Sequence, residues 1–189
     1  PSAAALPRRD FLKKTAAVTA AAAAAPLLRA PLYGQAPSAN VAGANNRIQV
    51  AVIGVGFGIG QNHLTGIHEK ANENNTVITA ACDVFNKRRD FAKAKANLKD
   101  ADVYVDYRKM LERKDIDAVL IATHDPLHAQ MILDSLETGR HVYCEKPLAY
   151  DIRECRAMAD AVKQSGRIVQ IGFQRRQSPA FQAVREHIQ

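Results

Sequence analysis

Residues 47 to 189 alternate short apolar runs with longer amphipathic stretches, and no other feature limits the possible folds as strongly. The apolar runs have the length of strands, and the stretches between them have the apolar spacing of helices. An alternation of strands and helices predicts βαβ units and a parallel sheet. We expect six strands, at residues 48–54, 76–82, 102–105, 117–122, 140–144 and 168–172.

Residues that favour helix ends lie between the predicted strands. Asp125 followed by Pro126 predicts an N-cap and a first-turn proline. Asp151 with Glu154 three residues later predicts a capping box, and Gly166 predicts the end of that helix. Right-handed crossovers between six strands then give a doubly wound parallel α/β sheet with the strand order 3-2-1-4-5-6.

The positive net charge of +7 is concentrated near the start of the chain. The first 45 residues contain five Lys or Arg and one acid, whereas the remainder contains 21 bases and 18 acids with both signs interspersed. Such a surface has no basic stripe, so we expect no binding to nucleic acid. The composition, 47% hydrophobic and 24% charged, suits one globular core.

Residues 1–45 have the layout of an export signal, with a charged start and an alanine-rich middle. The stretch RRDFLK at 8–13 resembles the twin-arginine (Tat) signal. A basic amphipathic helix would explain the charges but not the paired arginines before Phe-Leu-Lys. The segment is too weakly apolar for a stable membrane anchor, which needs about 20 apolar residues. We therefore expect the Tat machinery to export the folded protein to the periplasm or another extracytoplasmic compartment, with cleavage after Ala36, Ser38 or Ala44.

Neither the cysteines nor the histidines have the spacing of metal ligands. Cys82, Cys144 and Cys155 lie inside apolar patterns and are expected to be buried free thiols. His124 and His128 are four residues apart, but Pro126 between them places a helix start in the gap. His63 and His68 do not share a helix face, so the sequence predicts no metal site.

A glycine-rich turn, GVGFGIG at 54–60, follows the first predicted strand. Gly54 allows a tight turn, and Gly56 lets the backbone approach a pyrophosphate at the start of a helix. Ile59 occupies the usual third glycine position, and Gly60 supplies that glycine one residue late. The turn also suits S-adenosylmethionine-dependent methyltransferases or a purely structural role, and without a following GK[ST] it is not a P-loop. The predicted cofactor contacts here are Gly54, Gly56, Phe57, Gly58 and Ile59.

Asp83 ends the second predicted strand, 29 residues after Gly54. A carboxylate at this position accepts hydrogen bonds from ribose hydroxyls and repels a 2′-phosphate, which favours NAD over NADP. Lys87, Arg88 and Arg89 leave NADP as an alternative cofactor, because cations at this turn can hold the additional phosphate. The alternative interpretation of Asp83 is a helix N-cap.

Polar residues follow strands four and five, at the edge where an open parallel sheet binds its ligands. Thr123 and His124 follow strand four, and Glu145-Lys146-Pro147 follows strand five. A lysine there can exchange a proton with a substrate hydroxyl while the carbon exchanges hydride with nicotinamide. The alternative is a surface ion pair of little energetic value.

Three stretches, CEKPLA at 144–149, IATHDPLHA at 121–129 and GFQRR at 172–176, together with the glycine turn resemble the Gfo/Idh/MocA oxidoreductases. The resemblance covers Arg47 to about Phe181 and implies a Rossmann fold, a nicotinamide cofactor and a sugar-like or cyclitol substrate. It implies Lys146 as the catalytic residue and Thr123, His128, Glu145 and Lys146 as further cofactor contacts. The implied substrate contacts are Lys146, Gln174 and Arg175. His124 departs from the family, where Pro or Asn is common.

Members of that family continue into a second α/β domain, which usually supplies a catalytic histidine paired with aspartate. We therefore interpret residues 1–45 as the signal and linker, 46–177 as the NAD(P)-binding domain, and 178–189 as the start of a helix leading to a missing substrate domain. The chain would then be an inactive fragment, and a homo-oligomer is expected only for the full-length protein.

The expected function is that of an exported NAD(P)-dependent oxidoreductase that moves hydride between a sugar or cyclitol hydroxyl carbon and nicotinamide. Three alternatives stay open. They are an NAD-dependent glycoside hydrolase of the same family, a methyltransferase, and a dinucleotide-binding module without activity.

Overall fold

The structure is a computed structural model, and it describes residues 47–188. Within these residues six strands form one sheet in the order β3-β2-β1-β4-β5-β6, with every neighbouring pair parallel. The predicted fold class and strand order are confirmed. The strands are β1 (Ile48–Ile53), β2 (Thr76–Cys82), β3 (Val103–Tyr104), β4 (Ala118–Ile121), β5 (His141–Glu145) and β6 (Val169–Gly172).

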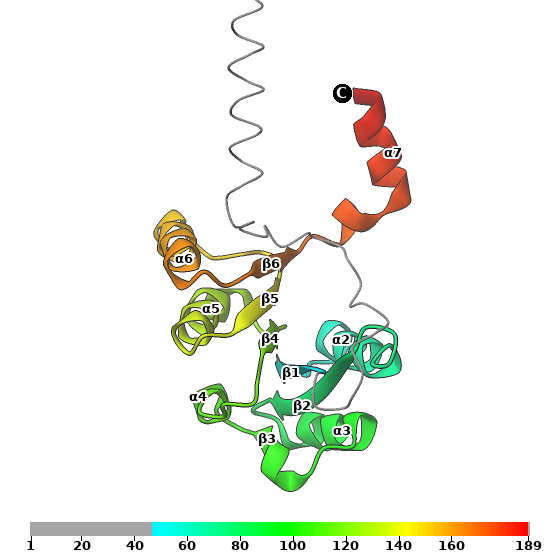
Figure 1. Cartoon of the computed structure of the whole chain (residues 1–189), viewed down its shortest axis with the longest axis vertical. Helices are drawn as coiled ribbons and strands as arrows, with labels where there is room; N and C mark the ends of the chain where they lie inside the picture. Colours follow the sequence, from blue (N-terminus) through cyan, green and yellow to red (C-terminus); the bar gives the residue numbers. More distant parts are fainter. Residues whose placement is uncertain (1–46, 189) are drawn as a thin grey trace, which may run out of the picture. The chain divides into compact units, whose positions relative to one another are not determined.

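Helices cover both faces of the sheet (Figure 1). One face carries α2 (Ile59–Glu69) and α3 (Asn86–Ala96), and the other carries α4 (Tyr107–Leu111), α5 (His128–Glu137) and α6 (Ile152–Ser165). The helix α7 (Pro179–Ile188) follows the last strand. Short 3-10 turns complete the domain: η2 (Asp100–Asp102), η3 (Asp125–Leu127) and η4 (Gln174–Gln177).

The central strand β1 buries side chains on both faces of the sheet. Ala51 and Ile53 belong to the larger core cluster, which also contains Met110 and Ile132 from α4 and α5. Val52 points the other way, into a smaller cluster with Leu64 of α2. Successive side chains of a strand alternate between faces, so an uninterrupted apolar run fits a strand covered by helices on both sides.

The ends of α6 largely follow the sequence prediction. Asp151 caps the helix by accepting a hydrogen bond from the Glu154 backbone N–H at 2.9 Å. The capping box is only half formed, because the Glu154 carboxylate accepts from the N–H of Tyr150 and not from that of Asp151. Gly166 ends the helix in the left-handed conformation, with φ of 62°.

The predicted N-cap at Asp125 is wrong. Asp125 is the first residue of the 3-10 turn η3, and His124 precedes it as the cap. Pro126 lies inside that turn, where its missing N–H costs no hydrogen bond. The α-helix α5 therefore begins only at His128.

All three cysteines are free thiols, as predicted. Cys82 and Cys144 are buried at the ends of β2 and β5, whereas Cys155 on α6 is only partly buried. Burial, followed by the neighbouring charges of Asp83 and Glu145 respectively, raises the pKa of Cys82 and Cys144 to about 12. Both thiols are therefore protonated and unreactive at neutral pH.

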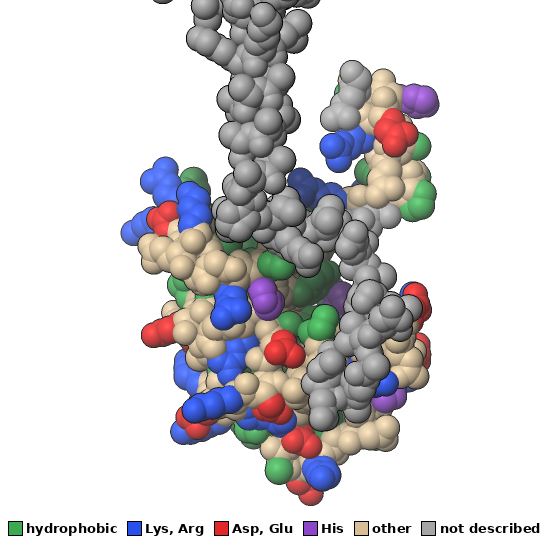
Figure 2. All heavy atoms as spheres, in the orientation of Figure 1, with side chains coloured by type: hydrophobic (Ala, Val, Ile, Leu, Met, Phe, Trp, Pro, Cys, Tyr) green, Lys and Arg blue, Asp and Glu red, His purple; other side chains and the backbone are tan. Residues whose placement is uncertain are grey.

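Acidic and basic side chains are interspersed on the face seen in Figure 2. No helix within residues 47–188 has the length and apolarity needed to cross a membrane. The same residues contain no group of three or more His, Cys, Asp or Glu side chains placed to hold a metal ion. The predicted signal and linker, residues 1–45, lie outside the part of the chain that the structure describes.

Candidate cofactor and active site

The turn between β1 and α2 brings the backbone close to the end of β4. Gly54 has a φ of +88°, and a Cβ there would lie 2.4 Å from the carbonyl oxygen of Ala122. A Cβ on Gly60 would lie 2.2 Å from the carbonyl oxygen of Gly54. Both distances are far below a van der Waals contact, so backbone packing requires glycine at both positions. Gly60, and not Ile59, thus has the packing role of the third glycine.

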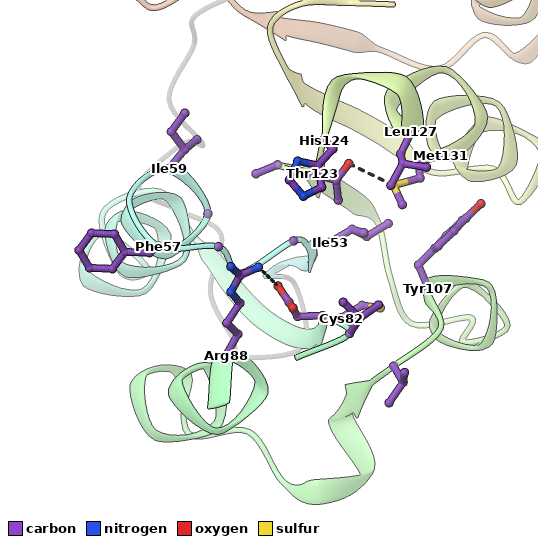
Figure 3. Close-up of a pocket in the computed structure, with 17 residues that line it drawn as sticks. Ile53, Phe57, Ile59, Cys82, Arg88, Tyr107, Thr123, His124, Leu127 and Met131 are labelled. Atoms are coloured by element: carbon purple, nitrogen blue, oxygen red, sulfur yellow. Dashed lines mark hydrogen bonds and ion pairs between the residues drawn. The ribbon is translucent and has the colours of Figure 1, made fainter. Parts of the chain in front are cut away.

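A cleft of about 400 Å³ opens beside this turn (Figure 3). The ends of β1, β2 and β4 form its walls, together with residues that follow β3. Its volume is within the range of small-molecule sites, about 300–1,000 Å³. The ring of Phe57 points away from the cleft and is 92% exposed. The predicted cofactor contacts that line it are Gly54, Gly56, Phe57, Ile59, Asp83 and Thr123.

Asp83 is a buried carboxylate at the end of β2, with an exposed fraction of 6%. Its Oδ2 accepts a hydrogen bond from the Val55 N–H at 2.8 Å, and its Oδ1 accepts from the Phe85 N–H at 2.9 Å. The residue that caps α3 is Phe85, so Asp83 is not the N-cap of that helix. A carboxylate has about four acceptor positions, and two remain here for ribose hydroxyls.

Arg88, in the first turn of α3, places a positive charge at the mouth of the cleft. Its Nη1 lies 3.7 Å from Asp83 Oδ2 and 3.7 Å from the position that a Cβ on Gly56 would occupy. Figure 3 shows the Arg88 guanidinium extending from α3 toward the end of β2, where Cys82 is labelled. The N-terminus of α2 adds N–H groups that have no partner within the helix. The Arg88 guanidinium and the N-terminus of α2 therefore both place positive charge beside Gly56, which leaves room for an anion.

The end of β4 supplies Thr123 to the cleft, and Thr123 Oγ1 donates a hydrogen bond to Met131 Sδ at 3.4 Å. His128, a predicted cofactor contact, is completely buried and does not line the cleft. Its Nδ1 lies 2.7 Å from the Pro147 carbonyl oxygen, and its Nε2 lies 3.2 Å from that of Thr123. Its side chain joins the loop after β4 to the loop after β5, and direct cofactor contact stays a prediction.

Gly58, another predicted cofactor contact, lies at the start of α2 but does not line the cleft. The other predicted site residues lie further along the same edge of the sheet. Glu145 ends β5 and is buried, whereas Lys146 directly after it is exposed. Gln174 and Arg175 lie in η4 after β6, and the Arg175 guanidinium stacks over the Phe181 ring at 5.5 Å. Parallel strands end at one edge, so the sheet brings these residues to the same side as the glycine turn. They do not line the cleft itself.

The sequence did not identify several residues that line the cleft. Val84, Val105 and Tyr107 reach it because they directly follow β2 and β3, and Leu127 and Met131 reach it from η3 and α5. Tyr107 Oη donates to Asp134 at 2.6 Å, and burial raises the pKa of Tyr107 to about 12. The sequence feature that could have identified these residues is their position just after a strand or at a helix start. Many residues without a role share that position.

Residues 48–173 match an oxidoreductase family with an NAD-binding Rossmann fold, GFO_IDH_MocA. The chain belongs to this family. The match extends from β1 to the residue after β6, so it includes every strand of the described sheet.

Several proteins similar to the chain are inositol dehydrogenases. The chain is 39% identical over 132 residues to an inositol 2-dehydrogenase/D-chiro-inositol 3-dehydrogenase of Shouchella clausii, covering 68% of the chain and 36% of that protein. It is 32% identical over 135 residues to an inositol 2-dehydrogenase of Salmonella typhimurium, covering 71% of the chain and 39% of that protein. A crystal structure of scyllo-inositol dehydrogenase from Lactobacillus casei with NAD(H) and scyllo-inositol is similar, with a TM-score of 0.69 and 29% identity, over 75% of the chain and 41% of that one. The chain thus spans well under half the length of these relatives.

The residues of the cleft fit a dinucleotide. Gly56 and the N-terminus of α2, with Arg88 beside them, would hold the pyrophosphate. Asp83 would accept hydrogen bonds from the ribose of the adenosine half. Along this edge, β2 and β5 are three strand spacings apart, or about 14 Å. The direction from β2 to β5 leads from Asp83 toward Glu145 and Lys146.

Replacing Asp83 tests this arrangement. Asp83→Ala removes the acceptor for the ribose, and we expect the dissociation constant of NAD to rise by roughly tenfold or more, with a weaker preference for NAD over NADP. Calorimetric titration of both dinucleotides measures this. Asp90→Ala on α3 is the matched control and should bind NAD like the wild type. An Asp83→Ala variant with unchanged affinity for both dinucleotides would contradict the assignment.

Proposed function

We propose that the whole protein containing these residues is an exported NAD-dependent oxidoreductase that acts on a hydroxyl carbon of a cyclitol or related sugar. The observation that carries the proposal is the common edge of the sheet, where the NAD-binding turn and Lys146 both lie. Membership of the family supports the reaction class. The names of the relatives support a cyclitol as the substrate.

Each part of the site has a separate task in this proposal. The glycine turn and Arg88 hold and neutralise the phosphates, and Asp83 orients the adenosine ribose. NAD, when bound, supplies the acceptor for the hydride. Lys146 is exposed at the end of β5, where its Nζ can exchange a proton with the substrate hydroxyl. Gln174 and Arg175, which follow the adjacent strand β6, bind further hydroxyls of the substrate in this proposal.

NAD is the preferred cofactor in this proposal. The buried carboxylate of Asp83 at the end of β2 disfavours the additional phosphate of NADP. Arg88 lies beside that carboxylate and reduces the repulsion, so we expect a preference and not complete exclusion.

The test of the proposed reaction is NADH formation by the whole protein with NAD and a panel of polyols that includes myo-inositol and scyllo-inositol. Net NADH formation with a cyclitol is the expected result. Release of a glycosidic product without net NADH would instead identify a hydrolase that reoxidises its cofactor within each turnover. Binding of NAD without turnover of any member of the panel would contradict the cyclitol assignment.

Replacing Lys146 tests its proposed catalytic role. Lys146→Ala should lower kcat by roughly 10²–10⁴, the usual range for loss of a general acid or base, while the dissociation constant of NAD changes little. Steady-state kinetics and NAD titration measure the two quantities. Lys163→Ala on the exposed side of α6 is the control and should have wild-type kcat. Equal kcat in Lys146→Ala and the wild type would exclude a catalytic role.

Export by the Tat pathway rests on residues 8–13, which lie outside the described part of the chain. Replacing Arg8 and Arg9 together with Lys keeps the charge but removes the arginine pair. We expect the double variant to stay in the cytoplasmic fraction of its host, while Arg29→Lys is exported normally. Fractionation followed by immunoblotting measures this, and normal export of the double variant would contradict the proposal.

A further inference from the structure

Three polar side chains form a cluster beside the cleft but do not line it: His63, Tyr143 and Glu145. His63 Nε2 and Glu145 Oε1 are 2.7 Å apart, and Tyr143 Oη donates to the same oxygen at 3.2 Å. The rings of His63 and Tyr143 meet edge to face, with their centroids 5.3 Å apart. Glu145 is only 9% exposed. A carboxylate with so little access to water needs such donors, and α2 and β5 provide them.

The neighbouring strand leaves room for this cluster. A Cβ on Gly172 of β6 would lie 2.5 Å from Tyr143 Oη and 2.8 Å from Glu145 Oε1. The carboxylate and the hydroxyl therefore occupy the space that any larger residue at position 172 would need. Burial and the charge of Glu145 raise the pKa of Tyr143 to about 12, so its hydroxyl keeps its proton and donates.

The cluster connects the two functional parts of the candidate site. His63 belongs to α2, whose N-terminus forms part of the glycine turn. Glu145 is the last residue of β5, and Lys146 is bonded directly to it. The contact between His63 and Glu145 therefore joins the helix of the cofactor turn to the backbone that carries the lysine, across 82 positions of sequence.

We propose that His63 is a positioning residue for Lys146. It acts through Glu145: by binding the buried carboxylate, it holds the end of β5 against α2 and fixes where the lysine leaves the sheet relative to the cofactor. Small displacements of a reacting group lower turnover strongly, whereas the phosphate and ribose contacts lie elsewhere and are retained. The expected loss of turnover rests on the proposed function. The expected loss of order in the loop that follows β5 does not.

The test compares His63→Ala and His63→Gln in the whole protein, with NAD and myo-inositol as the probe. His63→Ala should lower kcat on the order of tenfold while the dissociation constant of NAD changes by less than about threefold. His63→Gln should restore most of the kcat, because its amide N–H can donate to the carboxylate. His68→Ala, on the same helix, should behave like the wild type.

Gly172→Ala provides a second variant that removes no donor. Its Cβ displaces the ends of the Tyr143 and Glu145 side chains, so kcat should fall as in His63→Ala. Hydrogen exchange of the backbone amides within residues 145–149, Pro147 excepted, gives a readout that needs no turnover. Exchange should be faster in His63→Ala and Gly172→Ala, and close to that of the wild type in His63→Gln and His68→Ala.

The outcomes separate this inference from the proposed function. Wild-type kcat in His63→Ala would overturn the positioning role. The positioning role would also be overturned if His63→Ala and His63→Gln both lost kcat and NAD affinity to the same extent. Such losses would indicate general damage to the fold. If the wild type converts no cyclitol, the proposed function fails, and the exchange rates then decide the inference: unchanged exchange at residues 145–149 in His63→Ala overturns it.

Discussion

The candidate site depends on one close contact, between the turn after β1 and the end of β4. The Gly54 N–H donates to the Cys82 carbonyl at 2.8 Å, and the Ala122 N–H donates to the Ile53 carbonyl at 2.8 Å. These hydrogen bonds hold the turn in the plane of the sheet, where a side chain on Gly54 would overlap the Ala122 carbonyl. Because the turn is this tight, α2 begins at the edge of the sheet with its N-terminus beside the cleft.

The order of the strands distributes the functional groups along that edge. Asp83 follows β2, the glycine turn follows β1, Thr123 follows β4, and the Glu145–Lys146 pair follows β5. A ligand lying along the edge therefore meets acceptors first, then the positive end of a helix dipole and finally the lysine. The sheet serves mainly as a scaffold here, since its buried faces contribute rigidity while most of the candidate site residues lie in the loops.

The features that could be predicted from sequence are those that depend on local chemistry. The strands and their order followed from the apolar runs and from right-handed crossovers, and Gly166 ended α6 as expected. The need for glycine at Gly54 and Gly60 was also visible, because only glycine permits such close approach of two backbones. The error at Asp125 was local as well: the chain forms a 3-10 turn before α5 begins.

The features that could not be predicted depend on distant residues meeting in space. His63 had no evident partner in the sequence, yet its ring is in hydrogen-bonding contact with Glu145. His128 has the expected position after β4, but its two ring nitrogens face the carbonyls of Pro147 and Thr123. The pattern of residue types identifies a strand or a turn, but the direction of a side chain depends on the packing of several elements.

We propose that the cofactor lies along this edge with its phosphates at Gly56 and its nicotinamide near Lys146. A crystal structure of the whole protein with NAD tests it most directly. We expect electron density for the pyrophosphate at the N-terminus of α2, for the adenosine ribose beside Asp83, and for the nicotinamide ring at the end of β5. A nicotinamide beside Asp83, or a dinucleotide bound away from the glycine turn, would contradict it.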